Sequence, residues 1–297
     1  MYGISISLPS RGKYGKSSVE IRRPKLYDIL DYLQAGDNGV ASKNALIRDL
    51  CDTDLSKYPE GDREYIFVTL RTLIRDAVIT GTFPCEQKGC NDIVVYSLNL
   101  QNCKVNQLPD DFISGYELEF PICGVKKKLN LVTVEKGALL EEYTRFYETA
   151  DNGLLHTDLG ENLHELARYA CMFEDTKSLQ DIDANITLMR NDFDWTDFEI
   201  LMAYDLAFQC GPEVVSDTKC DNCKTKYKVN IKTDSSFFGL SIEGLVRKHK
   251  FLAKMANIGF KDFMEYTVPV MNTVVEDEIQ AVKEHNEKIR KIRSTNK

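Results

Sequence analysis

Two pairs of closely spaced cysteines constrain the fold of this chain more than any other feature of its sequence. Cys85 and Cys90 form the first pair, and Cys220 and Cys223 form the second. Thiolates are the preferred ligands of structural zinc, and two cysteines flanking a tight turn supply half of a tetrahedral site. The pairs lie far apart in the chain, so a shared site requires a fold that brings distant segments together. The sequence therefore predicts one closed zinc site with four cysteine ligands; the alternative is four reduced cysteines in loops.

The cysteine count argues against disulfide bonds. The chain has nine cysteines, an odd number. Its N-terminus, residues 1–5, lacks the basic and then apolar layout of a signal peptide. We therefore expect a protein of a reducing cytoplasm whose remaining cysteines are small buried hydrophobic residues. These five are Cys51, Cys103, Cys123, Cys171 and Cys210.

Composition and charge narrow the class of protein. With 297 residues, 43% hydrophobic and 28% charged, the chain is typical of a globular protein, and no apolar run is long enough to span a membrane. The net charge is −8, yet residues 1–25 carry +5 and residues 278–297 carry +3, which leaves −16 between them. An acidic body with basic ends favours protein partners over general nucleic-acid binding. The alternative is that both ends are simply solvated.

The hydrophobic pattern predicts an α+β protein. It is rich in helices, with short antiparallel strands, a zinc-ribbon-like four-cysteine centre and a helical C-terminal section. We expect an N-terminal strand and basic arm over residues 1–25, a mixed body with both cysteine pairs over residues 26–240, and the helical section over residues 241–297. Ser42, Ser178, Asp194 and Ser241 are candidate N-caps, and Asp158 with Glu161 resembles a capping box.

The surroundings of the two cysteine pairs resemble each other. A helix over residues 62–80 precedes the first pair, and a strand over residues 93–98 follows it. A helix over residues 195–208 precedes the second pair, and a strand over residues 227–231 follows it. This order predicts a duplicated unit of helix, cysteine turn and strand, unless the similarity is coincidental.

The last 57 residues, from Ser241 on, carry a helical pattern. Four residues of the final helix follow heptad spacing: Val275, Ile279, Val282 and Ile289. We expect this stripe to contact another protein, and the competing interpretation is that it packs entirely on its own body. On the first interpretation, truncation after Phe260 leaves the body folded and its zinc bound.

Each candidate catalytic motif in the sequence lacks a required residue, so no enzyme is expected. Residues 12–17 resemble a phosphate-binding loop but lack its first glycine, and His164 with Glu165 lacks the second histidine of a zinc protease. A basic stretch around the second cysteine pair supports an alternative function as a zinc-ribbon nucleic-acid-binding regulator. A DNA gel shift that weakens steeply with salt would identify that alternative. The stretch comprises Lys219, Lys224, Lys226, Tyr227, Lys228 and Lys232.

Several local signatures, taken in order, resemble one family: the baseplate hub and hub-assembly proteins of T-even-type contractile-tailed bacteriophages. The resemblance extends over about residues 20–293, and Lys224 stands where this family usually has glycine. The similar segments are residues 59–71, residues 120–134, residues 220–241 with the second cysteine pair and a double-Phe turn, and residues 259–270 with the charged helix after them.

The resemblance implies a non-enzymatic structural protein of the tail baseplate hub, or a factor that helps to assemble it. Its expected partners are other baseplate, hub or tail proteins, and a homo-oligomer within a symmetric assembly is a further option. Neither a membrane nor nucleic acid is expected as a partner. The expected location is the virion tail baseplate, the host cytoplasm during assembly, or both.

Overall fold

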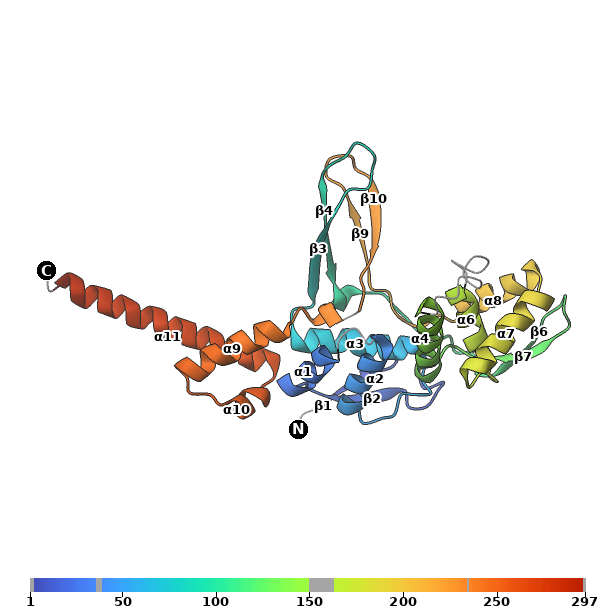
Figure 1. The fold of residues 1–297 in the computed structure, drawn as a ribbon, viewed down its shortest axis with the longest axis horizontal. Helices are drawn as coiled ribbons and strands as arrows, with labels where there is room; N and C mark the ends of the chain where they lie inside the picture. The colour runs from blue at the N-terminus through green and yellow to red at the C-terminus, as the bar shows by residue number, and fades with distance from the viewer. Residues whose placement is uncertain (1–2, 36–38, 150–162, 234, 296–297) are drawn as a thin grey trace.

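The chain adopts an α+β fold in a computed structural model that describes residues 3–35, 39–149, 163–233 and 235–295. Helices dominate, and the strands pair as short antiparallel hairpins and one two-residue bridge between β5 and β8 (Figure 1). The helices are α1 (Leu26–Gln34), α2 (Gly39–Leu50), α3 (Glu60–Ile74), α4 (Val134–Thr149), α6 (Leu163–Met172), α7 (Leu179–Asp192), α8 (Trp195–Ala207), α9 (Ile242–Met255), α10 (Phe260–Met264) and α11 (Val268–Thr295), with 3-10 turns η1 (Leu100–Asn102) and η3 (Ser235–Phe238). The strands are β1 (Gly3–Ser7), β2 (Ser18–Arg22), β3 (Val78–Pro84), β4 (Ile93–Asn99), β5 (Val105–Asn106), β6 (Tyr116–Glu119), β7 (Lys126–Leu129), β8 (Gly211–Pro212), β9 (Val215–Lys219) and β10 (Lys226–Asn230).

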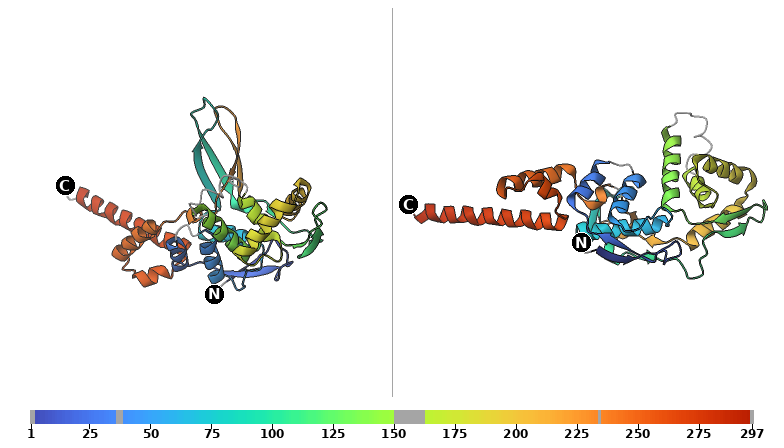
Figure 2. Two further views of the ribbon diagram at one scale, coloured as in Figure 1. Left: turned by 45° about the vertical axis from the view of Figure 1, so that its right-hand side comes forward. Right: turned by 90° about the horizontal axis from the view of Figure 1, so that it is seen from below.

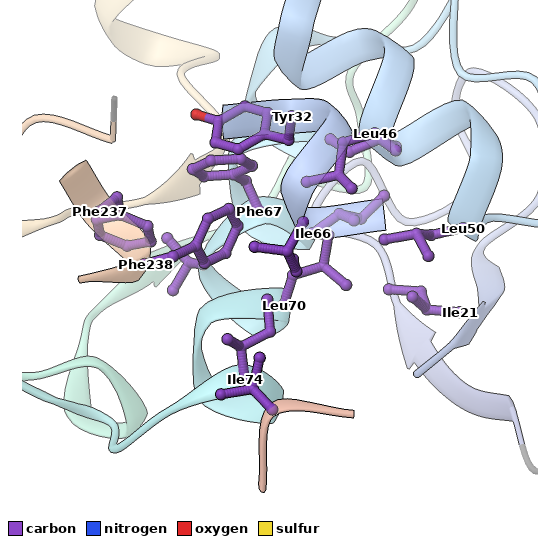
Figure 3. Packing of buried hydrophobic residues seen from close by; sticks show 14 of the residues in the cluster. Ile21, Tyr32, Leu46, Leu50, Ile66, Phe67, Leu70, Ile74, Phe237 and Phe238 are labelled. Carbon is purple, nitrogen blue, oxygen red and sulfur yellow. The ribbon is translucent and has the colours of Figure 1, made fainter. Parts of the chain in front are cut away.

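The larger hydrophobic core surrounds α3. It draws buried residues from β1 and β2, from α1 and α2, and from the C-terminal segment as far as Met271. Phe67 lies at its centre, with its ring centroid 4.9 Å from that of Phe238, and Tyr32 meets Phe238 edge-on at 5.5 Å (Figure 3). The double-Phe turn at Phe237 and Phe238 thus anchors the chain between β10 and α9 in this core.

A second hydrophobic core lies among α4, α6, α7 and α8, beside the β6–β7 hairpin. Its buried members all fall between Leu108 and Tyr204. The two cores meet where α3 passes β8: a Cβ atom on Gly61 would lie only 1.9 Å from the carbonyl oxygen of Cys210. Tyr14 also packs against both cores. Glycine at position 61 therefore permits the close approach of the two units.

Two hairpins project side by side from the body as a two-hairpin arm (Figure 1). The first consists of β3 and β4, and the second consists of β9 and β10. Side chains of β9 link them: the Ser216 hydroxyl donates to the Ser97 carbonyl at 3.0 Å, and the Thr218 hydroxyl donates to the Val95 carbonyl at 2.8 Å. The arm thus brings together two chain segments, one that precedes the residues of the second core in the sequence and one that follows them.

The C-terminal section belongs partly to the larger core. Phe263, Val268 and Met271 are buried there, and the N–H of Leu26 donates to the carbonyl of Tyr266 at 2.8 Å. Truncation after Phe260 would remove these core side chains, so the structure argues against the expectation that the body stays folded after that cut. Beyond this anchor α11 extends away from the body (Figure 2). No helix within the described ranges is both long and apolar enough to cross a membrane.

The predicted heptad stripe of α11 is only partly buried. Val275 packs against the larger core, Val282 is half-buried, and Ile279 is exposed. The exposure of the Ile289 side chain lies outside what the structure describes. The stripe therefore meets the body only near the start of the helix.

Some element boundaries differ from the sequence prediction. The helix expected over residues 62–80 ends at Ile74, since Arg75 is fully extended and the β-branched run at residues 78–80 begins β3. Ser42 lies inside α2 and is not its cap; the Glu141 carboxylate accepts a hydrogen bond from the N–H of Val40 near the start of that helix instead. The N-caps Ser178, Asp194 and Ser241 are confirmed, whereas Asp158 and Glu161 lie outside the described residues.

One acid is buried at the start of α3. Asp62 is fully buried, and its Oδ1 accepts a hydrogen bond from the N–H of Ser10 at 2.9 Å. Its Oδ2 has no hydrogen-bond partner among the described residues. Burial raises the pKa of Asp62 to about 6, and the hydrogen bonds with Ser10 oppose this rise only in part.

The raised pKa of Asp62 makes stability depend on pH. Between about pH 4 and 6 the folded chain holds a proton on Asp62 that the unfolded chain has lost, so stability falls as the pH rises through this window. Asp62→Asn keeps an oxygen for Ser10 and cannot ionise. We expect its free energy of unfolding to exceed that of the wild type by an amount that grows by about 2–3 kcal/mol from pH 4 to pH 7.

Urea unfolding of both proteins across this pH range measures the difference. Asp192→Asn, which removes an exposed acid at the end of α7, is the matched control. Its difference from the wild type is expected to stay nearly constant. A constant difference for Asp62→Asn as well would contradict the prediction.

Candidate metal centre

The first cysteine pair lies in the turn between β3 and β4. Cys85 follows β3 directly, and its N–H donates to the carbonyl of Asp92 at 2.9 Å, which continues the hairpin beyond its strands. The N–H of Cys90 donates to the carbonyl of Gln87 at 2.9 Å, and Gly89 adopts a φ of +84°. Glycine takes this left-handed conformation without strain, so the longer spacing of this pair still forms a compact turn.

The second pair lies in a tighter turn between β9 and β10. The N–H of Cys220 donates to the carbonyl of Thr225 at 2.9 Å, and the N–H of Lys224 donates to the carbonyl of Cys220 at 3.0 Å. Lys224 has a φ of +62°. This left-handed conformation favours glycine, and few other residues adopt it without strain.

The four predicted ligands come together at the far end of the two-hairpin arm. The sulfur atoms of Cys85, Cys90, Cys220 and Cys223 all lie within 4.8 Å of one another. The Cys85 and Cys223 sulfurs are 3.5 Å apart, and the Cys90 and Cys220 sulfurs are 3.7 Å apart. Each close contact joins one cysteine of the first pair to one of the second. A single metal ion could therefore bind all four and fasten the hairpins to each other.

Polar neighbours surround the sulfur atoms. The Tyr227 hydroxyl lies 2.9 Å from the Cys85 sulfur and accepts a hydrogen bond from the N–H of Glu86 at 3.1 Å. The Asn222 amide nitrogen lies 3.8 Å from the Cys90 sulfur. The Phe83 ring packs edge-on against Tyr227 with centroids 5.1 Å apart and covers one side of the cluster. Such outer contacts orient metal-binding thiolates and stabilise their charge.

The thiols differ in their ease of ionisation. Hydrogen bonds from the side chain and backbone of Thr225 lower the pKa of Cys223 to about 6. For Cys220, hydrogen bonding from the Cys223 backbone favours the thiolate. Burial and the neighbouring thiols of Cys223 and Cys90 outweigh it and raise the pKa of Cys220 to about 12. Four sulfurs this close cannot all ionise without a cation between them, so the donor set suits a metal ion.

No sequence pattern identified the residues around the sulfur atoms. Tyr227 stands out in the sequence only as an aromatic residue in a basic stretch, although a tyrosine shortly after a cysteine pair is a signal that could have marked it. Within that stretch, Lys228 lies opposite Asp217, and Lys226 lies opposite Lys219 on paired strands. The basic charge is thus spread over an exposed hairpin that also carries acidic residues.

The turn between β6 and β7 has the same backbone geometry, but the described residues form no metal cluster there. Like Cys220, Phe120 donates its N–H to the carbonyl five residues on and accepts a hydrogen bond from the N–H four residues on. Gly124 has a φ of +68° and corresponds to Lys224, and Cys123 corresponds to Cys223. Phe120 is fully buried in the second core. The buried Phe120 thus stabilises this turn by hydrophobic packing, whereas the turn between β9 and β10 has a cysteine of the cluster, Cys220, at the same position.

The other candidate motifs form no site among the described residues. Residues 12–17 belong to the turns between β1 and β2, and a strand follows where a phosphate-binding loop requires a helix. His164 lies exposed on α6, 3.4 Å from the Thr144 hydroxyl. Comparison with protein-family models, with curated proteins and with solved structures finds no match for this chain.

Proposed function

We propose that the four-cysteine cluster binds one structural zinc ion. Four thiolates form the soft, tetrahedral donor set that zinc prefers. A Zn–S bond of about 2.3 Å implies a distance of about 3.8 Å between sulfurs in a tetrahedron, close to the 3.5 and 3.7 Å of the two close contacts. All four positions are taken by protein, so none is left for a substrate. The role of this zinc is to join the hairpins of the arm.

We further propose that the protein is a non-enzymatic component of a phage tail baseplate hub, or a factor that assembles the hub, and acts through protein contacts. The observation that carries this proposal is the extension of α11 away from the body. On the projecting part, Ile279 is 40% exposed and Val282, the next residue of the same stripe, is half-buried. An apolar stripe on a projecting charged helix suits a partner helix or groove. The resemblance of the sequence to hub proteins supplies the class of partner.

Truncation after Asp277 tests the contact without cutting the core. It keeps Phe263, Val268 and Met271 in place and removes the outer part of α11. We expect the truncated protein to keep its metal and its free energy of unfolding within about 1 kcal/mol. It should recover at least about tenfold less tail protein, because the part of the stripe from Ile279 onward is gone.

The measurement is copurification of tagged full-length and truncated protein from phage-infected cells, with tail proteins identified by mass spectrometry. Lys250→Gln, at an exposed position of α9, is the control and should bind as the wild type does. Equal recovery of tail proteins by the truncated form would refute the role of α11. Recovery of no tail protein by the full-length chain would refute the hub proposal itself.

A further inference from the structure

A cavity lies where the two-hairpin arm joins the body. It has a volume of about 730 Å³ and is lined by α3, β3, β4, η3 and the end of β10 with the residues that follow it. This volume is within the range of about 300–1,000 Å³ that is typical of small-molecule sites. The polar and charged side chains that line it are Arg71, Arg75, Asp76, Thr80, Tyr96, Asn230 and Lys232.

Arg71 is the unusual member of this lining. Its side chain lies in the last turn of α3, and the residue is only 4% exposed. Its Nε and Nη1 atoms are buried and have no hydrogen-bond partner among the described residues. A buried cation without a counter-charge is costly, so an arginine in this position calls for an anion.

Arg63, two turns earlier on the same helix, provides a contrast. It is similarly buried, but its Nη2 lies 3.1 Å from a carboxylate oxygen of Glu60 and 3.0 Å from one of Glu64. The described structure contains no equivalent ion pair for Arg71. Asp76, the one acid among the described residues that line the cavity, is exposed. Its charge raises the pKa of Arg71, but burial and the nearby charge of Arg75 outweigh this effect and lower that pKa.

We propose that this cavity binds a phosphate group, carried by a small phosphate ester, with Arg71 as its main counter-charge. Arg71, Arg75 and Lys232 against Asp76 give the lining a net charge of +2. A phosphate monoester carries a charge of about −1.5 to −2 at pH 7 and accepts several hydrogen bonds, whereas a carboxylate carries only −1. Thr80 and Asn230 offer further donors, and the ring of Tyr96 offers a surface for the organic part. The site is independent of the metal centre and of the proposed hub function.

The test measures the thermal stability of the metal-loaded full-length protein. The probes are inorganic phosphate, phenyl phosphate and glutarate, each titrated against sodium chloride at constant ionic strength. We expect both phosphates to raise the melting temperature of the wild type in a saturable manner, with phenyl phosphate binding more tightly. Arg71→Met keeps an unbranched chain without the charge, and its dissociation constant for phosphate should rise at least about tenfold.

Arg190→Met, which removes an exposed arginine of α7, should respond to phosphate as the wild type does. Lys232→Gln changes an exposed residue at the cavity and should weaken phosphate binding several-fold, which keeps the test informative if Arg71→Met fails to fold. The proposal is overturned if neither phosphate stabilises the wild type, or if the foldable cavity variants respond as the wild type does. It is also overturned if glutarate stabilises as strongly, because the occupant is then a carboxylate.

Discussion

Replacing Cys220 by serine is expected to abolish metal binding and to unfold the far half of the two-hairpin arm. Cys220 is fully buried, and among the described residues its small hydrophobic cluster has two other buried members, Cys85 and Val94. Such a cluster cannot hold four strands together without metal, since structural zinc contributes on the order of 10–16 kcal/mol in small zinc-dependent units. The body should remain folded because the buried residues of both cores lie outside the arm strands.

Metal analysis of protein purified with reductant measures the first effect. The wild type should carry about one zinc per chain, and Cys220→Ser less than about a tenth of that. Hydrogen exchange measures the second: amides of β3, β4, β9 and β10 should lose protection in the variant, while those of α3 keep theirs. Chelation of the wild type should reproduce the variant.

The matched control is Cys123→Ser. Cys123 occupies the position equivalent to Cys223 in the β6–β7 turn, which has the same backbone geometry but, among the described residues, no metal cluster. This variant should keep its full zinc content and its protected arm. The prediction fails if Cys220→Ser retains zinc, or if removal of the metal leaves exchange in the arm unchanged.

Truncation after Phe260 is expected to unfold the larger core, in contrast to truncation after Asp277. The earlier cut removes Phe263, Val268 and Met271, each of which is at most 1% exposed. At about 1.5–3 kcal/mol for each buried side chain, the loss is roughly 5–9 kcal/mol. That is comparable with the entire free energy of unfolding of a typical domain, about 5–15 kcal/mol.

Circular dichroism and urea unfolding of the two truncated proteins measure this contrast. The earlier cut also removes Tyr266, whose carbonyl accepts the hydrogen bond from Leu26, and Glu265, which pairs with Lys25 at 2.5 Å. We therefore expect the N-terminal segment to lose its protection together with α1. If the protein truncated after Phe260 unfolds at the same urea concentration as the full chain, the C-terminal section contributes nothing to the core.

Local patterns predicted much of this fold. Three N-caps, the helix before the second cysteine pair and the strand after each pair follow from interactions between residues close in sequence, and the structure confirms them. The predicted proximity of the four cysteines is also confirmed, because pairs of ligands at turn spacing have few uses other than a shared metal. The zinc itself stays a prediction.

Patterns that depend on distant contacts were missed. β3 alternates between half-buried and exposed residues on a thin arm, so no apolar stripe marked it as a strand, and the preceding helix was extended through its start. The attachment of the C-terminal section was missed because α10 packs on α1, more than two hundred residues earlier in the chain, as well as on α9. Arg71, whose Nε and Nη1 have no hydrogen-bond partner among the described residues, has no sequence signal, because four separate segments line the cavity beside it.

The position of the four ligands also imposes an order on events during synthesis. Cys90 precedes Cys220 by 130 positions, and the buried residues of the second core, Leu108 to Tyr204, all lie between them. At about 5–20 residues per second, a ribosome needs roughly 6–26 s to pass from one pair to the other. During that interval only two of the four cysteine ligands are present in the nascent chain. The segment that forms the second core is therefore synthesised in full before the second cysteine pair is available to complete the four-cysteine site.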